Sequence, residues 1–320
     1  MSELLYDEIP FLDLDDFVNG SPEKKAAFVR NLGNAYTNIG FVSIKNHGLS
    51  HELTERLYAV VEKFFRLPND VKQKYEKREI AGQRGYISKG RERAKGRNTG
   101  DLKEFYHVGQ PEEGKSPAQP SNIWPDEVED FEKYTIQAYK ILLQIGIQIL
   151  RAIAVYLQLP ENYFDDLVKK GDSILRPIHY FPIENPEEIP DGAVRAAEHG
   201  DINLITLLMG ASADGLQVLR RDGKWIPITV LPDQIVVNVG DMLERLTNKK
   251  LKSTIHRVIN PPIELMNTSR FSIPFFLHPV SEMDLTCLPH CIDANNSKAF
   301  EDITAGEFLH QRLKEIGLKS

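Results

Sequence analysis

The sequence predicts a mainly β fold, a jelly roll or similar barrel with flanking helices, and three observations support this prediction. The chain has 320 residues, of which 41% are hydrophobic, so it can bury a large core. From Ile174 onward, short β-rich runs follow one another at close intervals, and turn signals separate them. Amphipathic helical patterns lie before this region, and another lies after it.

The first third of the chain alternates helix and strand. Ser21 can cap a helix predicted over residues 22–33. The run "GFVSIKNHG" at 40–48 alternates apolar and polar residues, which favours a short strand. Residues 51–67 place leucine, valine and phenylalanine on one broad face, which indicates a second helix. We therefore expect an α/β arrangement in this region.

A long apolar segment precedes the β-rich region. Residues 126–157 predict one long helix or two abutting helices, and 141–157 is the most apolar stretch of the chain. Gln144, Gln148 and Arg151 interrupt this stretch at helical spacing and form one polar stripe. The pattern indicates a buried amphipathic helix rather than a membrane span.

The β-rich region contains seven short runs: "ILRPIHYF", "LITLLMG", "LQVLR", "WIPITV", "QIVVNVG", "STIHRVI" and "RFSIPFFL". Asp222-Gly223 separates two of them and is typical of a β-hairpin. The tail from Ala305 again predicts a helix. We expect four regions that pack as one unit: an N-terminal α/β region at 1–120, a helical connector at 121–170, a β core at 171–285 and a helical tail at 286–320.

Composition and charge restrict the class of protein. A formal net charge of −7 and a pI near 5.8 argue against a nucleic-acid-binding protein. The two cysteines, Cys287 and Cys291, are too few for a disulfide scaffold and favour reduced thiols in a reducing cytosol. Residues 1–10 lack the features of a signal peptide. We expect a cytoplasmic protein without a nucleic-acid or membrane partner.

A basic run departs from the acidic character of the whole chain. Residues 72–97 contain ten Lys or Arg against three Glu, among four glycines, and Tyr86 lies within the run. Such a run is usually a solvated loop. The alternative interpretation is that the run covers a site for an anionic substrate. Such a substrate would be a carboxylate-bearing small molecule, and Tyr86 is a candidate contact to it.

Three residues have the types and spacing of a metal site. His199 and Asp201 are two residues apart, so in an extended chain they point to the same face. His256 follows Asp201 on a later predicted strand. Two histidines and one carboxylate on one face of an octahedral ion leave the opposite positions for O2 and a co-substrate, which is the facial triad suited to Fe(II). A His-x-Asp triplet alone is more often a pair of surface or hydrogen-bonded polar residues.

A carboxylate-binding pair follows the third ligand. Arg270 and Ser272 share one face of the next predicted strand, while Phe271 points the other way. A guanidinium fork with a neighbouring hydroxyl is well matched to one carboxylate. The alternative is a structural ion pair at the start of a strand.

Together these motifs resemble the 2-oxoglutarate/iron(II)-dependent oxygenases of the isopenicillin N synthase-like group. "IPFLDL" and "GFVSIKNHGL" are similar to the family's N-terminal region, and "DLKEFYHVG" and "NIWP" to its bacterial members. "HGD", "GLQVLRRDGKW", "VNVGDMLERLTNKKLKSTIHRV" and "RFSIPFF" follow in the family's order at about its spacing. The match covers most of the chain, and the series of motifs is far more specific than any one of them.

The resemblance implies a double-stranded β-helix core, Fe(II) bound by His199, Asp201 and His256, and 2-oxoglutarate bound through its distal carboxylate by Arg270 and Ser272. It implies a dioxygenase that uses O2 to oxidise, by hydroxylation, an unactivated C–H bond of a small molecule and releases succinate and CO2. Two alternatives remain. One is an Fe(II) oxidase of the isopenicillin N synthase type, which does not use 2-oxoglutarate. The other is a catalytically silent barrel that binds a small carboxylate or a protein partner.

One segment departs from the family's pattern. Many members carry an Asn and a Tyr before the proline of the strand that precedes His-x-Asp, and that tyrosine helps to hold the co-substrate. Here His179 and Phe181 occupy these places. Tyr180 is also a candidate for a substrate or co-substrate contact, although a regular strand is expected to direct it to the other face. His179 either contacts substrate or co-substrate or is a hydrogen-bonded core histidine.

Overall fold

The structure, a computed structural model, describes residues 5–80, 82–91, 103–183, 194–210, 215–229, 231 and 233–315. The strands in this part of the chain are β1 Phe11–Asp13, β2 Phe41–Lys45, β3 Gly85–Ile87, β4 Lys103–His107, β5 Ile174–Leu175, β6 Ile178–Tyr180, β7 Ala196–His199, β8 Ile205–Met209, β9 Leu216–Leu219, β10 Trp225–Pro227, β11 Ile235–Val239, β12 His256–Val258, β13 Arg270–Ser272 and β14 Pro274–Leu277.

Within the described residues these strands form three sheets that enclose one interior. The largest has the order β1-β2-β11-β8-β14-β5, and the other two are β10-β9-β12-β7 and β13-β6-β4-β3. One apolar cluster draws buried side chains from all three sheets, including Phe41, Phe105, Ile178, Val218 and Val236. Since these residues pack together, the sheets face one another as the walls of a barrel, which confirms the predicted mainly β class.

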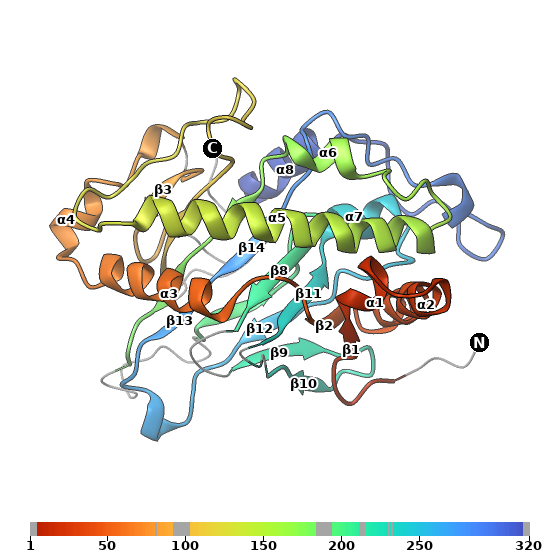
Figure 1. Cartoon of the computed structure of the whole chain (residues 1–320), viewed down its shortest axis with the longest axis horizontal. Helices are drawn as coiled ribbons and strands as arrows, with labels where there is room; N and C mark the ends of the chain where they lie inside the picture. The colour runs from red at the N-terminus through yellow and green to blue at the C-terminus, as the bar shows by residue number, and fades with distance from the viewer. Residues whose placement is uncertain are drawn as a thin grey trace.

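Helices α2 and α5 pack on the largest sheet, and other helices lie around them (Figure 1). The helices of the described residues are α1 Leu14–Val18, α2 Pro22–Asn38, α3 His51–Phe65, α4 Asn69–Gln73, α5 Phe131–Tyr156, α6 Asp165–Lys169, α7 Asp241–Leu246 and α8 Ala305–Glu315. The long helix α5 packs on β5, β8 and β14, with α2 and α3 beside it. It is long and apolar enough to cross a membrane, but 67% of its most apolar window is buried inside the protein. It is a core helix, as its polar stripe predicts.

Two helix boundaries differ from the prediction. Helix α2 continues past Gly33 to Asn38. A Cβ at Gly33 would lie 2.0 Å from the Tyr156 ring. This glycine permits close packing of α2 on α5 and does not end the helix. Helix α5 begins at Phe131 rather than 126, because Asp130 has a left-handed φ of 63° that a helix interior does not accommodate. The Ser21 cap is confirmed, since its hydroxyl accepts a hydrogen bond from the Lys24 amide.

The run "ILRPIHYF" forms two strands in different sheets. Strand β5 pairs with β14 of the largest sheet, whereas β6 pairs with β4 and β13. Arg176 and Pro177 link them, so the chain crosses between two walls of the barrel at this dipeptide. The predicted hairpin is confirmed: β9 and β10 are antiparallel neighbours joined around Gly223, and its amide donates to the Arg220 carbonyl at 2.8 Å.

Candidate metal centre and co-substrate site

Two histidines lie side by side where β7 pairs with β12. His199, the last residue of β7, is directly opposite His256, the first residue of β12. The register then shifts before Val258, which marks a β-bulge. Bulges re-aim side chains and are common next to active sites. The two imidazole rings have centroids 4.4 Å apart.

The carboxylate of Asp201 points at both rings. Its Oδ1 is 4.0 Å from His199 Nε2 and 3.7 Å from His256 Nε2. All three ligand atoms lie within 4.8 Å of one another. The expectation that His199 and Asp201 share an extended strand is wrong in detail, because β7 ends at His199. The turn after β7, rather than strand alternation, brings the carboxylate to the same side.

The second oxygen of Asp201 is held by the largest sheet. Oδ2 accepts hydrogen bonds from Thr206 Oγ1 at 2.6 Å and from Asn238 Nδ2 at 2.8 Å. Thr206 on β8 and Asn238 on β11 are direct partners across that sheet. Burial alone would raise the pKa of Asp201, but the charges of the two histidines and these hydrogen bonds lower it. The carboxylate is therefore ionised at neutral pH, and its Oδ1 is directed at the metal position.

Backbone carbonyls fix the tautomer of each histidine. His199 Nδ1 lies 2.7 Å from the Ala197 carbonyl, and His256 Nδ1 lies 3.1 Å from the Thr254 carbonyl. A carbonyl only accepts, so each Nδ1 carries the proton and each Nε2 presents a lone pair. Burial, and then the neighbouring His256, lower the pKa of His199 to about 4. This keeps the imidazole neutral at neutral pH, as a metal ligand must be.

Gly200 between the two ligands has a steric role. A Cβ at this position would lie 3.0 Å from Asp241 Oδ1 and 3.1 Å from Ser253 Oγ. These two atoms are hydrogen-bonded to each other at 2.6 Å. A side chain here would push this pair away and shift both neighbouring ligands. The glycine thus lets the His-Gly-Asp turn lie against the segment before β12.

The donor set fits Fe(II). Two neutral imidazoles and one carboxylate converge from one side, which is the facial triad of non-haem iron oxygenases. His199, Asp201 and His256 would hold the ion through Nε2, Oδ1 and Nε2. Within the described part of the chain, no other group of histidine, cysteine or acidic residues is arranged to hold a metal. Cys287 and Cys291 are both buried and free.

The predicted carboxylate-binding pair lies on β13. Arg270 is 2% exposed and Ser272 is buried, and both stand on the same face of the strand. Tyr180 of β6 is directly opposite Arg270, whose guanidinium lies 4.9 Å from the centre of the tyrosine ring. Tyr180 therefore shares the face of Arg270. The expectation that Tyr180 points away from the co-substrate site is wrong. His179, the register partner of Phe271, is the residue that points to the other face.

This face of the third sheet is turned toward the metal centre. Lys103 of β4 is the register partner of Tyr180, which places Lys103, Tyr180 and Arg270 in one row across three strands. Tyr180 belongs to the same buried cluster as Phe41, whose ring centre lies 5.5 Å from that of His256. The row and the triad therefore face the same interior.

The opposite face of the same sheet carries a buried polar network. Glu104 accepts hydrogen bonds from Lys72 Nζ at 2.9 and 2.7 Å and from the hydroxyl of Tyr86. His179 Nδ1 is 2.8 Å from Glu104, and His179 Nε2 is 2.9 Å from Ser269 Oγ. These contacts engage both ring nitrogens of His179 behind the sheet. The substrate or co-substrate contacts considered for His179 and Tyr86 are therefore not supported by this geometry.

Part of the basic run has a structural role. Lys72 is buried in the network above, and Arg84 is fully buried and bound to Asp172 at 2.7 Å. Residues 92–97 of the run lie outside the described residues. The predicted cover over an anionic site therefore stays a prediction for this part of the run.

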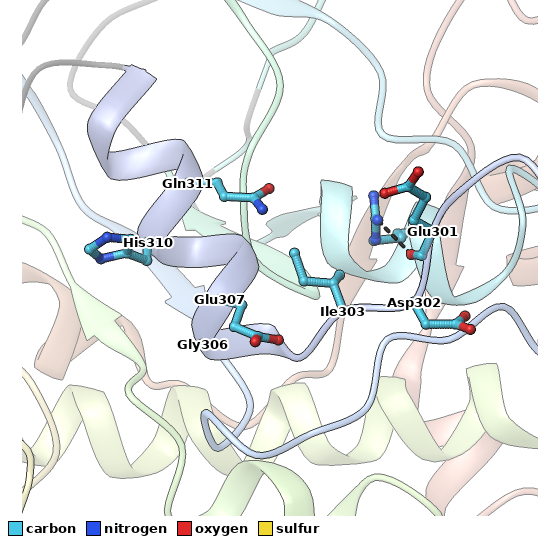
Figure 2. Close-up of a pocket in the computed structure, with 8 residues that line it drawn as sticks. Glu301, Asp302, Ile303, Gly306, Glu307, His310 and Gln311 are labelled. Atoms are coloured by element: carbon cyan, nitrogen blue, oxygen red, sulfur yellow. Dashed lines mark hydrogen bonds between the residues drawn. The ribbon is translucent and has the colours of Figure 1, made fainter.

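A surface pocket lies away from the triad. It is lined by Arg245 and by residues of α8 and the preceding segment (Figure 2). None of the triad residues and neither Arg270 nor Ser272 lines it. The positions of the triad and of the Arg270/Ser272 pair therefore assign the reaction site to the barrel interior, and the surface pocket is not part of it.

Family models match both halves of the chain. The family described as "non-haem dioxygenase in morphine synthesis N-terminal" matches residues 9–127, and the 2OG-Fe(II) oxygenase superfamily matches residues 171–279. The second match contains the triad and the Arg270/Ser272 pair. Among curated proteins, the chain is similar to proline hydroxylase buaE of Petromyces alliaceus, with 33% identity over 96% of this chain and 98% of that protein.

Solved structures agree with these matches. A 2OG-Fe(II) oxygenase family protein from Caulobacter crescentus is 40% identical with a TM-score of 0.85, over 96% of this chain and 99% of that one. A full-length Neurospora crassa protein in complex with alpha-KG and thymine is 31% identical with a TM-score of 0.86, over 98% of this chain and 99% of that one. From these matches and the metal-site geometry, the chain belongs to the 2OG-Fe(II) oxygenase superfamily and is a non-haem Fe(II)/2-oxoglutarate-dependent dioxygenase with a double-stranded β-helix core.

Proposed function

We propose that the enzyme hydroxylates an unactivated C–H bond of a small molecule and releases succinate and CO2. The observation that carries this proposal is the facial triad beside a buried guanidinium and hydroxyl on the facing wall of the same barrel. The relative named as a proline hydroxylase supports hydroxylation, and the neighbouring structure that contains thymine supports a small-molecule substrate.

Iron and 2-oxoglutarate, when bound, supply the activation of O2 that oxidation of a C–H bond requires. The protein's own contribution is position. His199, Asp201 and His256 would hold the ion through donor atoms that converge from one side of the site. Thr206 and Asn238 keep the Asp201 carboxylate oriented.

Arg270 and Ser272 would set the orientation of 2-oxoglutarate by binding its distal carboxylate. A guanidinium and a hydroxyl on one strand face bind one carboxylate through charge-assisted hydrogen bonds. The ring of Tyr180 under the guanidinium limits the movement of Arg270. Buried side chains such as Phe105 and Ile178 line the same interior and exclude water from the reacting groups.

Replacing Arg270 with alanine is expected to raise the 2-oxoglutarate concentration needed for half-maximal succinate formation roughly 30-fold, because a buried charge-assisted contact is lost. The measurement follows succinate from labelled 2-oxoglutarate with Fe(II)-loaded protein, which we expect to react slowly even without substrate. Arg220→Ala, which removes an arginine bound to Asp7 and Asp222, is the control. An unchanged 2-oxoglutarate requirement in Arg270→Ala would show that Arg270 does not bind the co-substrate. Substrate oxidation by the wild type without any succinate would favour the oxidase alternative.

A further inference from the structure

The strand that carries Arg270 has little backbone support of its own. Strand β13 is only three residues long and stands at an edge of the third sheet, where β6 is its pairing partner in the described part of the chain. The segment before it, residues 262–269, is exposed apart from the half-buried Met266. A short edge strand that follows an exposed segment has few contacts to fix its orientation. Side-chain contacts must therefore contribute to the placement of Arg270.

The ring of His179 contacts the residue on each side of Arg270. Its Nε2 lies 2.9 Å from the Oγ of Ser269. The same ring stacks on Phe271, with centroids 4.9 Å apart and planes 16° from parallel. His179 is also the register partner of Phe271 across β6 and β13. One side chain behind the sheet thus holds both neighbours of the arginine, whose own side chain projects from the opposite face.

His179 is itself fixed in place. Its Nδ1 is 2.8 Å from Glu104, whose lowered pKa keeps the carboxylate ionised, so the carboxylate accepts and Nδ1 carries the proton. The hydroxyl of Ser269 can donate or accept, and it therefore satisfies Nε2 in either case. The rings of Phe65 and Phe181 lie 5.6 and 4.9 Å from the imidazole. These contacts leave the ring one orientation.

The orientation of a guanidinium decides how well it binds a carboxylate. The fork of an arginine matches the two oxygens only when the groups are coplanar and aligned. Displacing a positioning group by about 1 Å can cost a large part of a site's function. A rotation of β13 would swing the guanidinium of Arg270 away from the ring of Tyr180, which lies 4.9 Å from it on the interior face. Contacts to Ser269 and Phe271 oppose this rotation.

We propose that His179 is a positioning residue for co-substrate binding. By holding Ser269 and Phe271, it keeps the guanidinium of Arg270 directed at the distal carboxylate of 2-oxoglutarate. It acts from behind the sheet and touches neither the co-substrate nor the metal. The inference rests on the proposed function, which assigns Arg270 to the co-substrate. A purely structural role for His179 would instead affect iron binding and co-substrate binding alike.

Anaerobic calorimetric titration of the Fe(II)-loaded protein with 2-oxoglutarate tests this role, and succinate formation supplies KM and kcat. Ser269→Ala removes one hydroxyl from an exposed residue and leaves the buried network intact, whereas Ser269→Thr keeps the hydroxyl. His179→Phe keeps a ring against Phe271 and loses both hydrogen bonds. Ser88→Ala is the matched control, because Ser88 follows β3 at the other edge of the same sheet and donates to Glu76 at 3.2 Å.

We expect Ser269→Ala to weaken 2-oxoglutarate binding roughly 3- to 10-fold, which corresponds to the loss of one hydrogen bond. The KM for 2-oxoglutarate should rise with it, while kcat at saturating co-substrate and the affinity for iron stay unchanged. Ser269→Thr should restore the wild-type affinity. His179→Phe should weaken binding at least as much as Ser269→Ala, and Ser88→Ala should have no effect.

A double variant shows whether the contact acts through Arg270. In protein that already carries Arg270→Ala, adding Ser269→Ala should weaken 2-oxoglutarate binding no further. An equal loss in that background, unchanged 2-oxoglutarate affinity in both Ser269→Ala and His179→Phe, or an equal loss of iron affinity overturns the proposal. Absence of succinate from the wild type would refute the proposed function alone, because the calorimetric affinities measure the positioning role without turnover.

Discussion

Replacing His199 with alanine is expected to abolish iron binding at the triad and to reduce 2-oxoglutarate turnover at least 100-fold. Loss of an outer-shell contact alone typically weakens metal binding by about 10- to 100-fold, and loss of a ligand removes more. Only His256 and Asp201 would remain on that side of the ion. Iron content after gel filtration and succinate formation measure the two effects.

His51→Ala is the control for this substitution. His51 begins α3 and its side chain is 67% exposed, so its removal touches neither the barrel interior nor the triad. This variant should bind iron like the wild type. If His199→Ala retained iron with wild-type affinity while remaining folded, His199 would not be a ligand.

The second large effect concerns stability. Glu104→Gln is expected to lower the free energy of unfolding by about 3–5 kcal/mol, because it leaves the charge of Lys72 buried without its partner. Both side chains of the pair are almost fully buried, at 7% and 1% exposed. The loss should appear as a lower midpoint of urea unfolding at neutral pH.

Glu113→Gln is the matched control, because Glu113 forms an exposed ion pair with Lys140, with side chains 67% and 55% exposed. Exposed pairs contribute less than about 1 kcal/mol. An effect of Glu104→Gln no larger than that of Glu113→Gln would contradict the account of the buried network.

The stability of the wild type and that of Glu104→Gln should respond differently to acid. Burial alone would raise the pKa of Glu104, but hydrogen bonds from His179, Lys72 and Tyr86 outweigh it and lower the pKa below its ordinary value of 4.5. Stability from this carboxylate is therefore fully present above that value and is lost as pH falls through the lower value of the folded state. The difference between wild type and Glu104→Gln should narrow below pH 4.5.

The sequence predicts the metal site well because spacing and strand pattern restrict it. His199, Asp201 and His256 have ligand chemistry that few other residues of the chain could supply together. Arg270 and Ser272 could be placed on one face because alternation along a strand is a local rule. The hairpin at Asp222-Gly223 follows from turn chemistry for the same reason.

The remaining residues depend on which strands become neighbours. Thr206 and Asn238 reach Asp201 only because β8 pairs with β11 in one register. Lys72 and Glu104 are 32 residues apart and meet behind a sheet. Strand alternation leaves the role of His179 open and directs Tyr180 away from the site, whereas the structure places Tyr180 on the face of Arg270 and His179 behind the sheet. The face of a three-residue strand is decided by its register with β4 and β13. Pairing across such distances is not encoded in a local pattern.

The most direct test of the central claim is a crystal structure of protein grown anaerobically with Fe(II) and 2-oxoglutarate, with diffraction recorded at the iron absorption edge. The account predicts one anomalous peak bonded to His199 Nε2, Asp201 Oδ1 and His256 Nε2, and the distal carboxylate of 2-oxoglutarate on Arg270 and Ser272. An iron peak at other ligands, or 2-oxoglutarate bound away from Arg270, would contradict it.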